Sequence, residues 1–194
     1  MADRPGTDMS QALGGEDGFT LLELLVAITL FAVGLIALVT SFDHSRDLVS
    51  VAEKTEVASH RAERELERIA SLPYASVAHS STPGSSASSA DPAFYVSGTN
   101  YQYDQGSTGP QSETLAVDGG GSISSSAGTW TDSEARLTGQ IQSFVTWTGA
   151  YCTAADRTRC AKRVTVAVTV GGDRPLRRPV LMSTVMTSPV GTGT

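Results

Sequence analysis

The stretch from Gly18 to Phe42 constrains this chain more than any other. It reads GFTLLELLVAITLFAVGLIALVTSF, an apolar run without proline. About 20 predominantly apolar residues in a helix cross a bilayer, and this run supplies that length. Glu23 lies a few residues inside the run, and an ionised carboxylate in hydrocarbon costs about 2.5–3.5 kcal/mol or more. The sequence therefore predicts a membrane helix whose carboxylate has a charged partner.

The residues before this run do not have the pattern of a secretory signal peptide. Residues 1–18 are polar, and their four carboxylates outnumber Arg4. A signal peptide has a positive start, a shorter apolar region and a cleavage site between small residues. We expect residues 1–18 to be a leader or a disordered tail. The formal charge of the 194-residue chain is −6, which does not favour nucleic acid as the default partner.

The helix is expected to continue beyond Phe42. Apolar residues recur at intervals of three, four or seven, as on one stripe of an amphipathic helix: Leu48, Val51, Ala58, Ala62, Leu66, Ile69 and Leu72. Charged residues fill the other faces, and Pro73 ends the pattern because the residue before a proline avoids the α region. We predict one helix of about 50 residues, with residues 19–42 in the membrane and residues 43–73 packed on a soluble domain.

Residues 74–136 are rich in serine and glycine. We expect an exposed linker over residues 76–92 and two short strands, 94–96 and 101–103, around a turn at Gly98–Asn100. Residues 104–135 are expected to form a long loop with at most one weak strand near Leu115–Val117.

Residues 137–194 carry the clearest strand signal. Leu137, Ile141, Val145 and Trp147 alternate with polar residues, with Phe144 as the exception, and four valines alternate from Val164 to Val170. A third strand is expected over Val180–Thr187. The predicted fold class is α+β: a long N-terminal helix with a hydrophobic first half, packed on one face of a small antiparallel sheet.

Cys152 and Cys160 are the two cysteines of the chain, and both lie between the first two of these strands. Two thiols cannot build a four-ligand zinc site. If this region is extracytoplasmic, a disulfide that staples the loop is expected, and two free thiols in a cytosolic domain remain the alternative.

Motifs for catalysis are missing from the sequence. It contains no H-E-x-x-H, G-x-S-x-G or G-x-x-x-x-G-K-[ST] pattern. His44, His60 and His79 stand apart in sequence from any pattern that would make them catalytic. We therefore expect no enzyme activity, no cofactor and no metal site.

Basic residues cluster late in the chain: Arg157, Arg159, Lys162, Arg163, Arg174, Arg177 and Arg178. Such a cluster could bind DNA or an acidic partner. Without interleaved aromatic residues that stack on bases, a solvated sheet edge is the favoured interpretation.

The segment Gly18-Phe19-Thr20-Leu21-Leu22-Glu23 resembles the processing site of type IV prepilins and of type II secretion pseudopilins. The resemblance implies that a prepilin peptidase cleaves between Gly18 and Phe19 and methylates the new amine of Phe19. It also implies that Glu23 faces the terminal amine of a neighbouring subunit in a filament, an ammonium partner that offsets the cost of burial.

Other segments resemble the minor pilins called pilus modification proteins and the minor pseudopilins of type II secretion: Leu24–Ala27 with Gly34-Leu35, residues 62–74 and residues 162–168. Thr40 stands where major pilins often carry a helix-kinking proline, which favours a minor subunit.

The resemblance implies a structural subunit held in the cytoplasmic membrane by a single span, with its C-terminal domain extracytoplasmic, and then assembled into a filament. Its partners would be other pilin or pseudopilin subunits, the prepilin peptidase and the inner-membrane assembly platform. Two alternatives stay open: a membrane-anchored binding module, either an adhesin or a DNA-uptake component, on the same scaffold, and a plain single-pass anchored domain.

Overall fold

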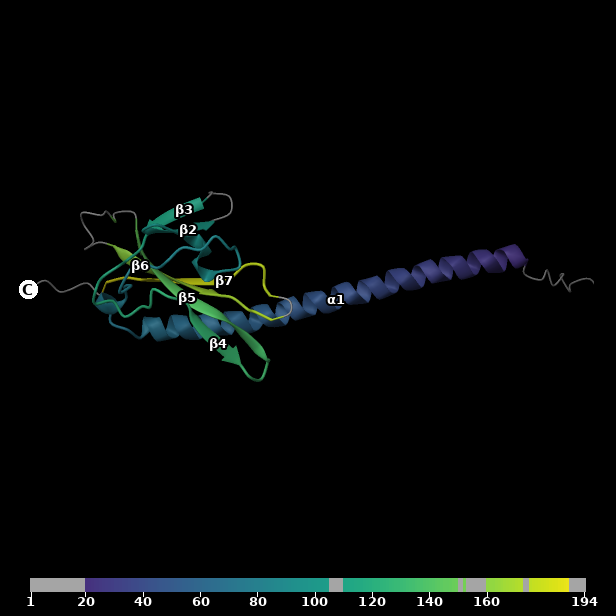
Figure 1. The fold of residues 1–194 in the computed structure, drawn as a ribbon, viewed down its shortest axis with the longest axis horizontal. Coiled ribbons are helices and arrows are strands. Elements are labelled where there is room, and N and C mark those ends of the chain that lie inside the picture. Colours follow the sequence, from purple (N-terminus) through teal and green to yellow (C-terminus); the bar gives the residue numbers. More distant parts are fainter. Residues whose placement is uncertain (1–19, 105–109, 150–151, 153–159, 173–174, 189–194) are drawn as a thin grey trace, which may run out of the picture. The chain divides into compact units, whose positions relative to one another are not determined.

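The computed structural model describes residues 20–104, 110–149, 152, 160–172 and 175–188. The chain divides into two units, one ending at Leu48 and one beginning at Val49. The first unit is helical throughout its described part, and the second contains all the described strands (Figure 1). This agrees with the predicted α+β class, an N-terminal helix with antiparallel sheets.

Helix α1 runs from Leu21 to Ala70. It ends three residues before Pro73, where the backbone N–H of Leu72 donates to the carbonyl of Ile69 in a tightened last turn. Ala58, Ala62 and Ile69 are fully buried, which confirms the C-terminal part of the predicted apolar stripe. Val51, the earlier stripe residue of this unit, is exposed.

The larger sheet has four antiparallel strands in the order β4-β5-β6-β7. Strand β4 is Gly128–Asp132, β5 is Leu137–Thr148, β6 is Ala161–Val168 and β7 is Val180–Met186. Strands β5, β6 and β7 match the three strands predicted from the alternation of apolar and polar residues. Consecutive strands are neighbours, as expected for a meander (Figure 1).

The smaller sheet has three strands in the order β1-β2-β3: Val96–Ser97, Asn100–Asp104 and Pro110–Thr114. Two 3-10 helices precede it, η1 at Tyr74–Ser76 and η2 at Pro92–Tyr95. The turn between β1 and β2 contains Gly98 with a positive φ of 59°, which glycine adopts without a steric penalty.

Three sequence predictions for this region are wrong. The linker expected to be exposed over residues 76–92 contains Val77, Ala78 and His79 near its start, which are buried because this part of the chain bonds to later segments. Phe94 and Tyr95 belong to η2 rather than to a strand, because Asp91 caps that helix by accepting a hydrogen bond from the backbone N–H of Ala93. The stretch 104–135 contains β3 and β4 in addition to single bridges at Leu115 and Val117. Each pairs with a strand next to it in the chain, β3 with β2 and β4 with β5. Their sequences, PQSET and GTWTD, contain at most one large apolar residue, so no alternation of apolar and polar residues is visible.

The four-stranded sheet is covered on both faces. On one face the buried residues of α1 pack with the alternate valines Val145, Val164, Val166 and Val168. On the other face Phe144 and Ala167 pack with Tyr101, and the rings of Phe144 and Tyr101 have centroids 4.7 Å apart. The exception at Phe144 in the alternation is thus explained, since Phe144 belongs to a second core that the prediction of a single covered face missed.

Strand β5 is longer than β4, and a different part of the chain satisfies the rest of its edge. The N–H of Ala116 donates to the carbonyl of Val145 at 2.8 Å, and Nε2 of His79 accepts from the N–H of Val145 at 3.0 Å. The N–H of His79 in turn donates to the carbonyl of Ala116. A buried imidazole therefore replaces a strand partner in the middle of the core.

Candidate functional site

The first turn of α1 carries Glu23 and is closed by Thr20. Oγ1 of Thr20 accepts a hydrogen bond from the backbone N–H of Glu23 at 3.2 Å, and the carbonyl of Thr20 accepts from Leu24. Thr20 is thus the N-cap, and Thr20–Glu23 has the T-x-x-E spacing of a capping box. The proposed cleavage residues Gly18 and Phe19 lie outside the described residues.

The side chains of α1 between Leu21 and Phe42 are exposed in the isolated chain, including every large apolar one. Thr29 and Thr40 are polar exceptions, and each hydroxyl donates to carbonyls three and four residues earlier at 2.8–3.2 Å. Such bonds satisfy a hydroxyl inside the helix itself, so it can lie in hydrocarbon. Among the described residues, α1 is the one helix long and apolar enough to cross a membrane.

Glu23 shares one face of α1 with two small residues. Ala27 and Gly34 lie four and eleven residues further on, close to whole numbers of helical turns. A Cβ atom placed at Gly34 would meet nothing within 4 Å. The helix therefore presents a carboxylate above a face on which a second helix can approach closely.

Comparison with known families places a motif on this segment. The family model described as the prokaryotic N-terminal methylation motif matches residues 15–39. The chain has a type IV prepilin-like N-terminus. No curated protein and no solved structure matches the chain.

The matched motif covers residues 15–39 of the 194 and describes the N-terminal segment. It supports membership of the type IV pilin and pseudopilin group, whose members are processed by prepilin peptidase, assemble with other pilin subunits and are generally structural proteins. Together with the apolar helix it indicates membrane anchoring. Among the described residues no group of three or more His, Cys, Asp or Glu side chains is placed to hold a metal ion.

The C-terminal half of the prepilin-like helix is fastened to the sheet by Arg61. Its guanidinium donates to the carbonyl of Thr131 at 3.2 Å, pairs with Asp132 at 3.4 Å and lies 5.5 Å from the ring centroid of Trp130. The N–H groups of Ala135 and Glu134, together with Arg61, hold the pKa of the Asp132 carboxyl below its usual value. One arginine thus connects α1 to the end of β4.

Glu65 makes a second connection, one turn further along. It accepts two hydrogen bonds from Arg68 at 2.7 and 2.8 Å and one from the hydroxyl of Ser143 on β5 at 3.1 Å. The Glu65–Arg68 spacing was visible in the sequence as a pair three residues apart, but the bond to Ser143 was not.

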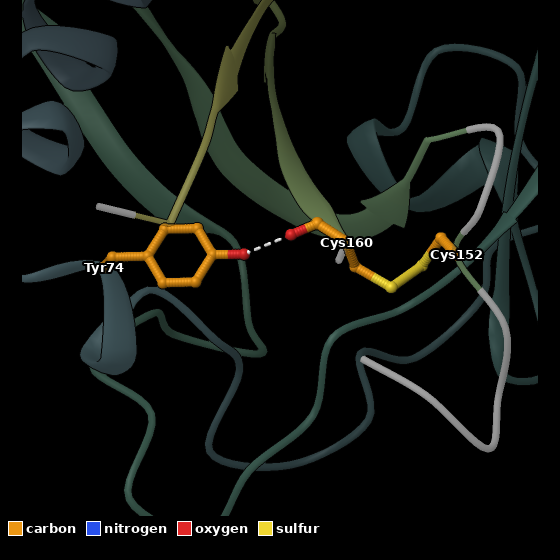
Figure 2. Close-up of a disulfide and its surroundings, with 3 residues drawn as sticks. All are labelled: Tyr74, Cys152 and Cys160. Carbon is orange, nitrogen blue, oxygen red and sulfur yellow. Dashed lines mark hydrogen bonds between the residues drawn. A yellow bond between two sulfur atoms is a disulfide. The ribbon is translucent and has the colours of Figure 1, made fainter. Parts of the chain in front are cut away.

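Cys152 and Cys160 are joined by a disulfide whose surroundings hold the turn after α1 (Figure 2). The hydroxyl of Tyr74 donates to the carbonyl of Cys160 at 2.8 Å, and Nζ of Lys162 donates to the carbonyl of Tyr74, also at 2.8 Å. Lys162 lies 4.5 Å from the ring centroid of Tyr74 and 5.0 Å from that of Trp147. Cys160 and Lys162 therefore bind both the side chain and the backbone of Tyr74.

Lys162 is only 3% exposed, and burial lowers the pKa of its ammonium group from the usual value. Two aromatic faces and a carbonyl replace much of the water that the charge loses. The sequence analysis assigned Lys162 to a surface basic cluster, and this assignment was wrong.

The basic cluster does not form one surface in the described part of the chain. Lys162 faces the α1 side of the sheet, while Arg163, next to it on β6, faces the other side and pairs with Glu113 at 3.2 Å. Arg157, Arg159 and Arg174 lie outside the described residues. Arg177 and Arg178 are the described members that remain exposed.

Proposed function

We propose that this protein is a minor pilin or pseudopilin subunit that a prepilin peptidase cleaves between Gly18 and Phe19 and that assembles through α1 into a type IV pilus-like filament. The observation that carries the proposal is the methylation motif at residues 15–39, which overlaps a helix whose apolar residues from Leu21 to Phe42 are exposed in the described part of the chain. A segment of this kind needs lipid before assembly and other subunits after it.

Glu23 is proposed to set the register of assembly. After cleavage, the methylated amine of Phe19 is an ammonium group, and a carboxylate from a neighbouring helix is its natural partner in a low-dielectric bundle. An unpaired Glu23 would bear a cost of about 2.5–3.5 kcal/mol in the membrane. The small residues Ala27 and Gly34 on the same face would let the two helices approach.

A minor rather than a major subunit is inferred from Thr40. A proline there would remove one backbone donor and kink the helix, whereas Thr40 bonds within an unbroken helix. The disulfide fits a C-terminal domain on the extracytoplasmic side of a single span, where disulfides persist. Delivery to the filament would then require an assembly platform in the cytoplasmic membrane.

Processing is tested by mass spectrometry of the N-terminus. The chain is expressed with and without an active prepilin peptidase, and the terminal peptide is analysed after each. We expect a start at N-methylated Phe19 only with the active enzyme, and Gly18→Val should block it. A start at Met1 or Ala2 in the presence of the active peptidase would sink the proposal.

Assembly is tested with Glu23→Ala and Glu23→Gln. Both variants should insert and be cleaved, yet fail to enter sheared filaments when co-expressed with the assembly machinery. Glu67→Ala is a matched control, because it removes one exposed carboxylate from the same helix. Normal incorporation of Glu23→Gln would refute the charge-pair account while leaving processing untouched.

A further inference from the structure

The two outer edges of the four-stranded sheet are treated differently. Along the β4 edge, Arg61 donates to the carbonyl of Thr131 and pairs with Asp132. Along the β7 edge, the described residues provide no hydrogen bond other than those to β6. Every second residue of an antiparallel edge strand points its N–H and C=O outward, so β7 offers a row of such groups to another strand.

The composition of β7 does not prevent other strands from pairing with this edge. The strand reads VLMSTVM over seven residues and contains no charge and no proline. Natural edge strands are usually short, interrupted by proline or bulges, or carry charged residues, because an open apolar edge is a template for pairing. Strand β7 therefore lacks the charges and prolines that usually block pairing at a sheet edge.

Exposed apolar side chains accompany the free edge. Leu181 is 37% exposed and Val185 is 48% exposed, and both lie on the sheet face opposite α1 with Ser183 between them. Only two other large apolar residues outside α1 are exposed in the described part of the chain, Phe94 and Val117. Half of the exposed large apolar residues described outside α1 thus stand on one edge strand.

Two arginines mark the start of the strand. Arg177 and Arg178 are exposed, and no carboxylate among the described residues pairs with either of them. They stand out in a chain whose formal charge is −6. A partner lying along β7 would be attracted at this end if it carried negative charge there.

We propose that β7 is a docking edge for an extended segment of another protein, which adds a strand to the sheet and places acidic side chains beside Arg177 and Arg178. Backbone bonds to β7 would give affinity, and alternate apolar side chains over Leu181 and Val185 would give specificity. The proposal is independent of the function proposed above, since it uses only the sheet.

A second copy of this chain fits the edge less well. Two β7 strands paired with each other would bring no carboxylate to the arginines, because residues 180–188 contain no Asp or Glu. A seven-residue strand is only about 23 Å long, so pairing along it makes a short contact. The contact is therefore suited to a weak, reversible partner with a complementary charge.

The experiment measures binding of labelled synthetic peptides to the full chain in detergent micelles by fluorescence anisotropy. One peptide has eight alternating valines and threonines followed by three glutamates, and a second has the glutamates first. Two further peptides carry three lysines in place of the three glutamates. We expect one of the two acidic peptides to bind at least tenfold more tightly than its lysine counterpart. The peptide with C-terminal glutamates should be the tighter binder if the added strand is antiparallel to β7, and the peptide with N-terminal glutamates if it is parallel.

Paired variants locate the contact. Leu181→Lys with Val185→Lys should weaken binding at least tenfold, whereas Phe94→Lys with Val117→Lys, a matched pair of exposed apolar positions, should leave it unchanged. Arg177→Glu with Arg178→Glu should reverse the preference towards the lysine counterpart. Thermal melts of each variant check that the fold persists.

Three results would overturn the proposal. The first is no binding of either acidic peptide at millimolar concentration, and the second is equal weakening by both lysine pairs. The third is self-association of the unmodified chain that Leu181→Lys with Val185→Lys abolishes, because the occupant would then be a second copy.

Discussion

Acidification below neutral pH should weaken the fold through one residue, His79. Its ring is fully buried, and its Nε2 accepts the hydrogen bond from the N–H of Val145. A protonated imidazole cannot accept that bond. Burial lowers the pKa of His79, although the backbone at Ser124 and Ile123 partly opposes this effect. The native state therefore favours the neutral ring.

The sign and size of the effect follow from this shift. The unfolded chain takes up a proton near the ordinary histidine pKa of about 6.5, while the folded chain resists it until a lower pH. The contribution of His79 is thus fully present above about pH 6.5 and is lost as the pH falls. The loss approaches about 1.4 kcal/mol for each pH unit until the folded pKa is reached. For a unit of roughly 150 residues this lowers Tm by at most about 6 °C between pH 7.5 and 5.5.

The assay is a thermal melt of the full chain in detergent, followed by tryptophan fluorescence at pH 7.5, 6.5 and 5.5. His79→Gln keeps an acceptor within reach of Val145 but does not titrate, so its Tm should change much less over this range. His60→Gln changes an exposed histidine on α1 and should keep the pH dependence of the original chain. If His79→Gln loses as much Tm as the original chain on acidification, the reasoning fails.

Three further predictions concern stability and use the same melts. Gly139→Ala should lower the free energy of unfolding by about 3 kcal/mol or more, because a Cβ atom there would collide with the carbonyl of Thr169 and the ring of Trp130. Gly128→Ala is the control: its Cβ atom would have its nearest contact at 3.8 Å, so the loss should be less than about 1 kcal/mol. Cys152→Ser should cost about 2.5 kcal/mol by opening the loop that Cys160 closes, and reductant should lower the Tm of the original chain but not of this variant. Lys162→Ala should cost about 2–4 kcal/mol, since it leaves a cavity and removes a charged hydrogen bond to the carbonyl of Tyr74. An unchanged Tm would show that the buried ammonium contributes nothing.

Periodicity predicted the elements that carry their own pattern. The helix to Ala70 and strands β5, β6 and β7 are long enough for a spacing of 3.6 or 2 to be visible. The burial of Ala58, Ala62 and Ile69 on one face of α1 follows from the same spacing. Predictions from periodicity depend only on residues that are close in the chain.

Strand β4 could not be predicted because its five residues carry almost no pattern. It has one buried side chain, Trp130, with exposed or half-buried residues around it. Trp130 stands opposite Gly139 on the neighbouring strand β5, where the missing side chain leaves room for the indole ring. A glycine that makes space for a tryptophan across a strand pair looks, in sequence, like any other glycine.

The candidate site was predictable to a different degree. Glu23 is visible from sequence alone, because a carboxylate within an apolar run is costly to bury in a membrane. The capping role of Thr20 was equally visible as a T-x-x-E spacing but went unused. The burial of Lys162 had no local signal, since lysine in an alternating strand normally faces water.

The serine- and glycine-rich region 76–135 is part of the core, and this bears on what the protein can bind. His79 and Ala116 are buried and hydrogen-bonded to each other and to Val145 of β5. Ile123 is also buried, and its backbone groups bond to those of Ala78 and Ser80. A ligand that bound to the backbone of these segments would have to break the hydrogen bonds that complete the edge of β5. This would leave backbone groups unpaired in the core. Binding without unfolding must therefore use surfaces whose hydrogen-bonding groups are still free, and the outer edge of β7 is such a surface.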